Sequence, residues 1–201
     1  MKTIMRHGIL KILELFYEMK REKAGIHLRE IARRTKLNEN SASRFLNQLE
    51  EEGILVSKKE GNMKKYSYKK SSSTYIIFSM FDDKKYQNLP AIRKEAMNKF
   101  FSKLKEQPIT ALLFGSTAGG GYRKDSDIDL LLVVNKKIKT DEAAEYAESQ
   151  TGIRIQAIQL TAEELIMESR LFKDPLISSA IKTGFPILNH AKYYEMTENE
   201  D

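Results

Sequence analysis

Two aspartates at alternate positions, Asp127 and Asp129, begin an apolar stretch that runs to residue 134. In a β-strand, side chains two residues apart point to the same face, about 7 Å apart along the strand. Two carboxylates at that spacing supply the oxygen ligands that Mg²⁺ (or Mn²⁺) prefers. The pattern therefore predicts a site for a divalent cation at the beginning of this strand.

A glycine and a serine lie upstream of the aspartates, directly after an apolar run at residues 109–114 that is typical of a buried strand. Gly115 allows the backbone to approach a phosphate closely. Ser116 offers a hydroxyl and an amide at the start of a predicted helix, where anions are favoured. A phosphate-binding turn followed by Asp127 and Asp129 predicts a site for a metal–nucleoside triphosphate.

Residues 113–116 together with residues 125–133 resemble the signature of the nucleotidyltransferase superfamily, which has a DNA polymerase beta-like fold. The resemblance is closest to the minimal nucleotidyltransferases of bacteria and archaea. It implies that Gly115 and Ser116 hold the triphosphate and that the catalytic residues Asp127 and Asp129 bind Mg²⁺. The metal would align the α-phosphate for attack by an acceptor hydroxyl and stabilise the leaving pyrophosphate.

Catalytic members of this superfamily usually carry a third carboxylate on a neighbouring strand, and this sequence departs from that pattern. The candidate strand, residues 153–160, contains no Asp or Glu, and Gln156 lies nearest to the expected position. A neutral amide cannot act as a general base. Glu163 and Glu164 follow, but we expect them in the first turn of a helix capped by Thr161.

Residues 1–70 predict a winged helix-turn-helix domain. Apolar residues at helical spacing mark a first helix near residues 9–19 and a short second helix near residues 28–34, and Asn38 is the expected N-cap of a third helix. Two strands joined by a turn at residues 61–62 would form the wing. The pattern resembles that of the winged-helix transcription regulators, the ArsR-like and MarR-like families included.

The outward face of the third helix carries short polar side chains and one arginine, which suit base edges and phosphates in a major groove. These residues are Ser41, Ser43, Arg44, Asn47 and Gln48. Four lysines flank the turn of the wing, where they could contact phosphates: Lys58, Lys59, Lys64 and Lys65. The set predicts binding to double-stranded DNA, with protein contacts as the alternative. The apolar first helix could form a homodimer interface or belong to the core.

The charge of the chain is divided unevenly. Residues 1–70 carry 17 Lys and Arg against 9 Asp and Glu, whereas residues 71–201 carry 17 against 19. The basic excess therefore belongs to the first third of the chain, and it favours a polyanionic partner, nucleic acid before an anionic membrane. A solvated basic surface without a partner is the alternative.

A polar run near residue 70 predicts a linker at residues 71–90 and a second domain over residues 91–201. The expected fold class is α+β, a winged helix-turn-helix followed by a mixed α/β sheet domain of the polymerase beta-like type. The absence of Cys excludes disulfides and Cys-ligated metal sites. No apolar run approaches the roughly 20 residues needed to cross a bilayer, so we expect a cytoplasmic protein without a membrane partner.

Two functions of different classes are open. The first is an enzyme that transfers a nucleotide from a nucleoside triphosphate to a nucleic-acid or protein acceptor. That acceptor could be a toxin, since minimal nucleotidyltransferases often resemble antitoxins. The second is a non-catalytic transcriptional regulator whose nucleotidyltransferase-like domain senses nucleotide or mediates dimerisation. The missing third carboxylate favours the second, and the intact Gly115, Ser116, Asp127 and Asp129 favour at least Mg–nucleotide binding.

Overall fold

The chain divides into two units, residues 1–81 and residues 82–201. The computed structural model describes residues 6–20, 22 and 24–198. The boundary between the units lies inside one helix, α4 (Ser72–Gln87), between Phe81 and Asp82. Among the described helices, none is long and apolar enough to cross a membrane.

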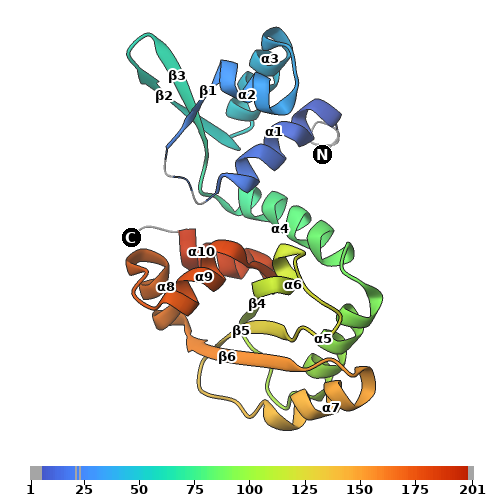
Figure 1. Ribbon diagram of the computed structural model, residues 1–201. Coiled ribbons are helices and arrows are strands. Elements are labelled where there is room, and N and C mark those ends of the chain that lie inside the picture. Colours follow the sequence, from blue (N-terminus) through green and yellow to red (C-terminus); the bar gives the residue numbers. More distant parts are fainter. Residues whose placement is uncertain (1–5, 21, 23, 199–201) are drawn as a thin grey trace. The chain divides into compact units, whose positions relative to one another are not determined.

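Three helices and a three-stranded antiparallel sheet form most of the first unit (Figure 1). The helices are α1 (His7–Glu18), α2 (Leu28–Thr35) and α3 (Glu39–Glu51), and the strands, in the order β1-β3-β2, are β1 (Ile26–His27), β2 (Leu55–Glu60) and β3 (Met63–Tyr68). The predicted N-cap of α3 is confirmed, because the Asn38 side chain accepts a hydrogen bond from the backbone N–H of Ser41 at 2.8 Å. Strands β2 and β3 form a hairpin whose turn contains Gly61 at φ +59°. The winged helix-turn-helix expected from the sequence is therefore present.

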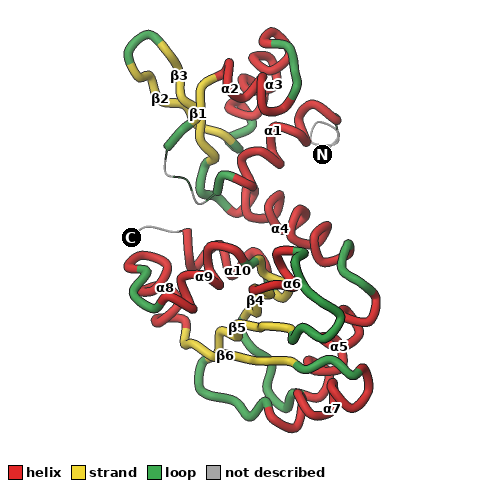
Figure 2. Tube along the Cα trace, viewed as in Figure 1, coloured by secondary structure: helices red, strands yellow, loops and turns green. Residues whose placement is uncertain are grey.

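Helix α4 occupies most of residues 71–90, where the sequence suggested a linker (Figure 2). The serine run that suggested a linker supplies a helix cap instead, since Ser71 Oγ accepts a hydrogen bond from the backbone N–H of Thr74 at 3.4 Å. The first half of α4 packs into the first unit through aromatic contacts. Phe78 meets Tyr17 and Tyr68 with ring centroids 5.6 and 5.1 Å apart. This burial of aromatic surface stabilises a helix where polar composition alone predicted a loop.

The second unit is a four-stranded mixed sheet with helices on both faces. Its elements in chain order, after the end of α4, are α5 (Ala91–Lys103), β4 (Thr110–Phe114), α6 (Gly115–Gly119), β5 (Ile128–Val134), α7 (Asp141–Thr151), β6 (Ile155–Thr161), α8 (Ala162–Leu171), α9 (Pro175–Thr183), β7 (Phe185–Leu188) and α10 (His190–Glu198). The strand order is β6-β5-β4-β7, in which β5 and β6 are parallel and the other pairs are antiparallel. The mixed sheet confirms the predicted fold class.

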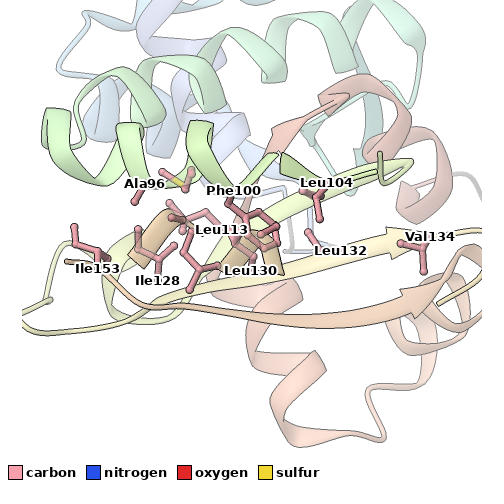
Figure 3. Close-up of a cluster of buried hydrophobic side chains, with 14 of the residues drawn as sticks. Ala96, Phe100, Leu104, Leu113, Ile128, Leu130, Leu132, Val134 and Ile153 are labelled. Carbon is pink, nitrogen blue, oxygen red and sulfur yellow. The ribbon is translucent and has the colours of Figure 1, made fainter. Parts of the chain in front are cut away.

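The core of the second unit fixes which way the β5 side chains point. Ile128, Leu130, Leu132 and Val134 are buried in one cluster with Phe100 of α5, as Figure 3 shows. Burial of each such side chain stabilises the fold by about 1.5–3 kcal/mol. Because side chains alternate along a strand, the Asp129 side chain projects from the face of the sheet opposite α5.

Candidate nucleotide site and DNA-binding surface

The predicted carboxylates lie where three strands meet. Asp129, near the start of β5, is paired with Phe114, the last residue of β4, and with Gln156 on β6. Asp127 lies immediately before β5, and both aspartate side chains are partly exposed. The sheet therefore brings the two predicted metal ligands together with Gln156, the residue nearest to the position where a third carboxylate is expected.

Gly115 joins the phosphate-binding half of the candidate site to the metal-binding half. It directly follows β4 and adopts φ +68°, a left-handed conformation that glycine tolerates best. A Cβ atom at this position would collide with Oδ2 of Asp129. Glycine is thus required here both by its backbone angle and by the space that the Asp129 carboxylate occupies.

Ser116 lies in the first turn of α6, and its side chain is exposed. In the described part of the chain, no partner is found for its hydroxyl, which leaves that group accessible to a ligand next to Gly115. The five residues of α6 are followed by a loop that leads to Asp127. Gly115 and Ser116 therefore lie next to each other between β4 and the rest of α6, and their contact with a triphosphate stays a prediction.

Gln156 makes a direct contact inside the site. Its Nε2 donates a hydrogen bond to Oδ2 of Asp127. Gln156 therefore lies beside both predicted metal ligands, paired with Asp129 in the sheet and hydrogen-bonded to Asp127. A carboxylate at this place would repel Asp127, whereas the amide binds it.

The two aspartates of the candidate site, Asp127 and Asp129, both carry negative charge. Burial, and then the negative charge of Asp127, raise the pKa of Asp129 above the ordinary value for an aspartate. Within the described ranges, no group of three His, Cys, Asp or Glu residues converges on a metal position. The carboxylates of Asp127 and Asp129, with the amide of Gln156 next to them, form an oxygen-rich donor set that fits one divalent cation.

Arg93 is a residue of the site that sequence reasoning missed. It lies in α5 with only 2% of its surface exposed. Its Nη1 donates to Oγ1 of Thr117 in α6 at 2.7 Å, and its Nη2 donates to the carbonyl oxygens of Arg123 and Ser126 at 2.9 and 3.0 Å. One side chain thus holds the helix that follows Gly115 and the turn that precedes Asp127.

The charge of Arg93 is balanced by dipoles rather than by an acid. None of the described carboxylates pairs with it, and its guanidinium lies 4.2 Å from the ring centroid of Tyr122. A sequence signal was available, because Arg93 shares helical spacing with the buried residues Ala96, Met97 and Phe100. A cation on the core-facing stripe of an amphipathic helix indicates a specific buried partner.

The predicted DNA-binding residues of α3 differ in exposure. Arg44 and Asn47 are exposed, whereas Ser41, Ser43 and Gln48 are half-buried. The Nε2 of Gln48 donates to Oε1 of Glu52 at 3.2 Å. Arg44 and Asn47 are consequently the two exposed side chains among the five predicted DNA-binding residues of α3.

The four wing lysines divide between the two faces of the hairpin. Lys59 pairs with Lys64 in the register of β2 and β3, and Lys58 pairs with Lys65, so adjacent pairs point to opposite faces. Lys64 forms an ion pair with Glu50 of α3 at 3.5 Å, and Lys65 forms one with Glu60. The face with Lys59 and Lys64 is therefore the one that adjoins α3.

The fold and the site define a nucleotidyltransferase-type domain preceded by a winged helix-turn-helix domain. Residues 95–192 match the family model for polymerase beta nucleotidyltransferases, and residues 9–58 match the model for the IclR helix-turn-helix domain. The chain is accordingly a fusion of a helix-turn-helix domain and a polymerase beta-type nucleotidyltransferase domain.

Solved structures and curated proteins were also compared with the chain. A similar solved structure is described as the predicted DNA-binding transcriptional regulator from E. coli, with 23% identity and a TM-score of 0.34 over 41% of this chain and 81% of that one. No curated protein matches the chain.

Proposed function

We propose that this chain is a DNA-binding regulator whose nucleotidyltransferase domain binds a nucleoside triphosphate with Mg²⁺ or Mn²⁺ and uses it mainly as a ligand. The observation that carries the proposal is the position of Gln156, beside Asp129 in the sheet and hydrogen-bonded to Asp127. An amide in that position cannot take the proton of an acceptor hydroxyl. Nucleotide binding without efficient transfer is the result we expect.

The nucleotide side of the proposal is supported by the donor set around Gly115. Asp127 and Asp129 would hold the metal, and the exposed Ser116 hydroxyl beside Gly115 would contact the triphosphate. The cation would offset phosphate charge and the repulsion between the two aspartates.

The DNA side of the proposal is supported by the helix-turn-helix domain and its charge. Arg44 and Asn47 on α3, with Lys59 and Lys64 on the adjoining face of the wing, offer base-reading and phosphate-binding groups from neighbouring elements. The basic excess of residues 1–70 favours the same polyanionic partner.

Transfer of a nucleotide to a nucleic-acid or protein acceptor, such as a toxin, is the second candidate. It is favoured by the intact pair of aspartates and by the close fit of Gly115 against Asp129. In that case the acceptor itself, or a group on a partner, would have to supply the base that Gln156 does not.

One pair of experiments separates these functions. Calorimetry with each nucleoside triphosphate and Mg²⁺ measures binding, which we expect in the wild type and not in a variant carrying Asp127→Ala and Asp129→Ala. Incubation with α-labelled nucleotides and cell extract measures transfer. Binding without labelled product supports the regulator, binding with labelled RNA or protein supports the enzyme, and absence of Mg²⁺-dependent binding refutes both.

A further inference from the structure

Helix α8 presents an exposed face that neither the nucleotide site nor the DNA-binding surface uses. Glu163, Ile166, Met167, Arg170 and Leu171 follow one another at helical spacing and line a shallow groove of about 380 Å³. Half of the surface of Met167 and of Leu171 is exposed, 50% and 53%. Figure 1 shows α8 directly after β6, beside α9. We call this set of five residues the α8 face.

Some charged residues of α8 are engaged in contacts within the chain, and others are not, depending on the side of the helix on which they lie. Glu164 closes a capping box with Thr161, and Oε2 of Glu168 accepts a hydrogen bond from the backbone N–H of Asp174 at 3.0 Å. By contrast, Glu163 and Arg170 on the α8 face are exposed, and neither has a partner within the described part of the chain. The α8 face therefore carries one acid and one base that have no partner among the described residues, around a partly exposed apolar centre.

The order of these residues is self-complementary. Glu163 and Arg170 lie at equal distances on either side of the midpoint between Ile166 and Met167. If two copies of α8 pack antiparallel about a two-fold axis through that midpoint, Glu163 of each copy faces Arg170 of the other, and Ile166 faces Met167. A partner of a single charge would be repelled at one end of this face.

We propose that the α8 face is a homodimer interface, in which a second copy of this chain packs its own α8 antiparallel against the first. Each Glu163 is then paired with the Arg170 of the other copy, which gives two ion pairs in the dimer, and the apolar centre leaves water.

Neighbouring residues enlarge the apolar surface. Phe172 and Leu176, which follow α8, are 39% and 52% exposed. Phe172 adopts φ +48°, a left-handed angle that is unfavourable for a residue with a large side chain. The Nζ of Lys182 in α9 lies 4.7 Å from the ring centroid of Phe172, so a contact within the chain holds this ring at the end of α8.

Charge exchange in the full-length chain tests this proposal. Sedimentation velocity should show wild-type dimers that dissociate on dilution. Glu163→Arg alone places arginine against arginine, and Arg170→Glu alone places glutamate against glutamate. Each should weaken dimerisation by at least about tenfold.

The decisive experiment mixes the Glu163→Arg variant with the Arg170→Glu variant. One copy then carries two bases and the other two acids, so a heterodimer with both ion pairs should form although neither variant dimerises alone. Glu148→Arg, on an exposed position of α7, is the matched control and should leave the wild-type dimer unchanged. A monomeric wild type, single variants that still dimerise, or a mixture that stays monomeric would each overturn the proposal, while circular dichroism verifies that every variant is folded.

Discussion

The amide of Gln156 donates a hydrogen bond to the carboxylate of Asp127, across the gap between β6 and the residue before β5. Gln156 is at the same time the register partner of Asp129. These two relationships place a neutral side chain against both predicted metal ligands. In the absence of a cation, the Gln156 amide lessens the repulsion between Asp127 and Asp129. When a cation is bound, Gln156 contributes no charge to the site.

The first prediction concerns Gln156→Glu, which puts a carboxylate in nearly the same volume. Without metal, a third negative charge beside Asp127 and Asp129 should lower the melting temperature, and Mg²⁺ should restore it. If the chain has an acceptor, transfer of labelled nucleotide should increase by about 10²-fold or more, the usual contribution of a general base. Gln150→Glu on α7 is the matched control and should produce neither effect. An unchanged melting temperature would contradict the assigned position of Gln156.

The second prediction is that Asp129→Asn separates stability from binding. Because burial and Asp127 both disfavour the charged form of Asp129, removal of that charge should raise the melting temperature of the metal-free protein. The same substitution should abolish Mg²⁺-dependent nucleotide binding. Differential scanning calorimetry and titration calorimetry measure the two effects, and a destabilised variant would show that the carboxylate is needed for folding instead.

The third prediction is that Arg93 positions the site without contacting the ligand. Arg93→Met removes the bonds to Thr117 and to the turn before Asp127 but retains the aliphatic part of the side chain. We expect a folded protein whose affinity for Mg–nucleotide falls by about tenfold or more, since small displacements of binding groups are costly. Hydrogen exchange should become faster in residues 120–126.

Arg93→Lys keeps the charge but cannot reach three acceptors in the same planar geometry, so it should resemble Arg93→Met. Lys99→Met, on the same helix, is the control and should bind as the wild type does. Wild-type affinity in both Arg93 variants would show that the turn before Asp127 holds its shape unaided.

The fourth prediction distinguishes base reading from phosphate contact in the first unit. Arg44→Ala should weaken binding to a preferred duplex by about 5–100-fold and reduce discrimination between sequences. Lys59→Ala should weaken binding to every duplex similarly and lower the salt dependence by about one unit of slope. Lys69→Ala serves as an exposed control outside both elements. Gel shifts at several salt concentrations measure these effects, and equal loss of specificity in both variants would argue against α3 as the reading helix.

The fifth prediction concerns pH and His190 at the start of α10. Burial lowers the pKa of His190, although the charges of Asp82 and Asp83 act in the opposite direction. Its Nε2 is buried and has no partner among the described atoms. Because the unfolded chain binds the proton more readily, stability should fall as the pH drops below about 6.5, the ordinary value for histidine.

His190→Gln should remove that part of the pH dependence. Urea unfolding at pH values above and below 6.5 measures it, and the midpoint should shift less in His190→Gln than in the wild type. An identical shift in both proteins would assign the effect to other groups.

Local signals in the sequence predicted many of the elements. Asn38 caps α3 and Thr161 caps α8 because short polar side chains before an apolar helical pattern satisfy free backbone amides, and both caps were expected. These features depend on residues close together in the chain.

Features that depend on distant residues were not predictable in the same way. Helix α4 is stabilised by packing of Phe78 on Tyr17 and Tyr68, which no local pattern reveals. The hydrogen bonds of Arg93 join a helix to a loop 30 residues or more further along the chain. A single sequence shows that such a residue is unusual, but only the fold identifies its partners.

The close approach of Gly115 to Asp129 has a consequence for sequence change. Because an oxygen of the Asp129 carboxylate occupies the place of a Cβ atom, a larger residue at position 115 requires the Asp129 side chain to turn away from its present position. A relative with a larger residue at the first position should carry a smaller or differently oriented one at the second. Covariation of this pair across an alignment would therefore distinguish relatives that retain the metal-binding carboxylate from relatives that have lost it.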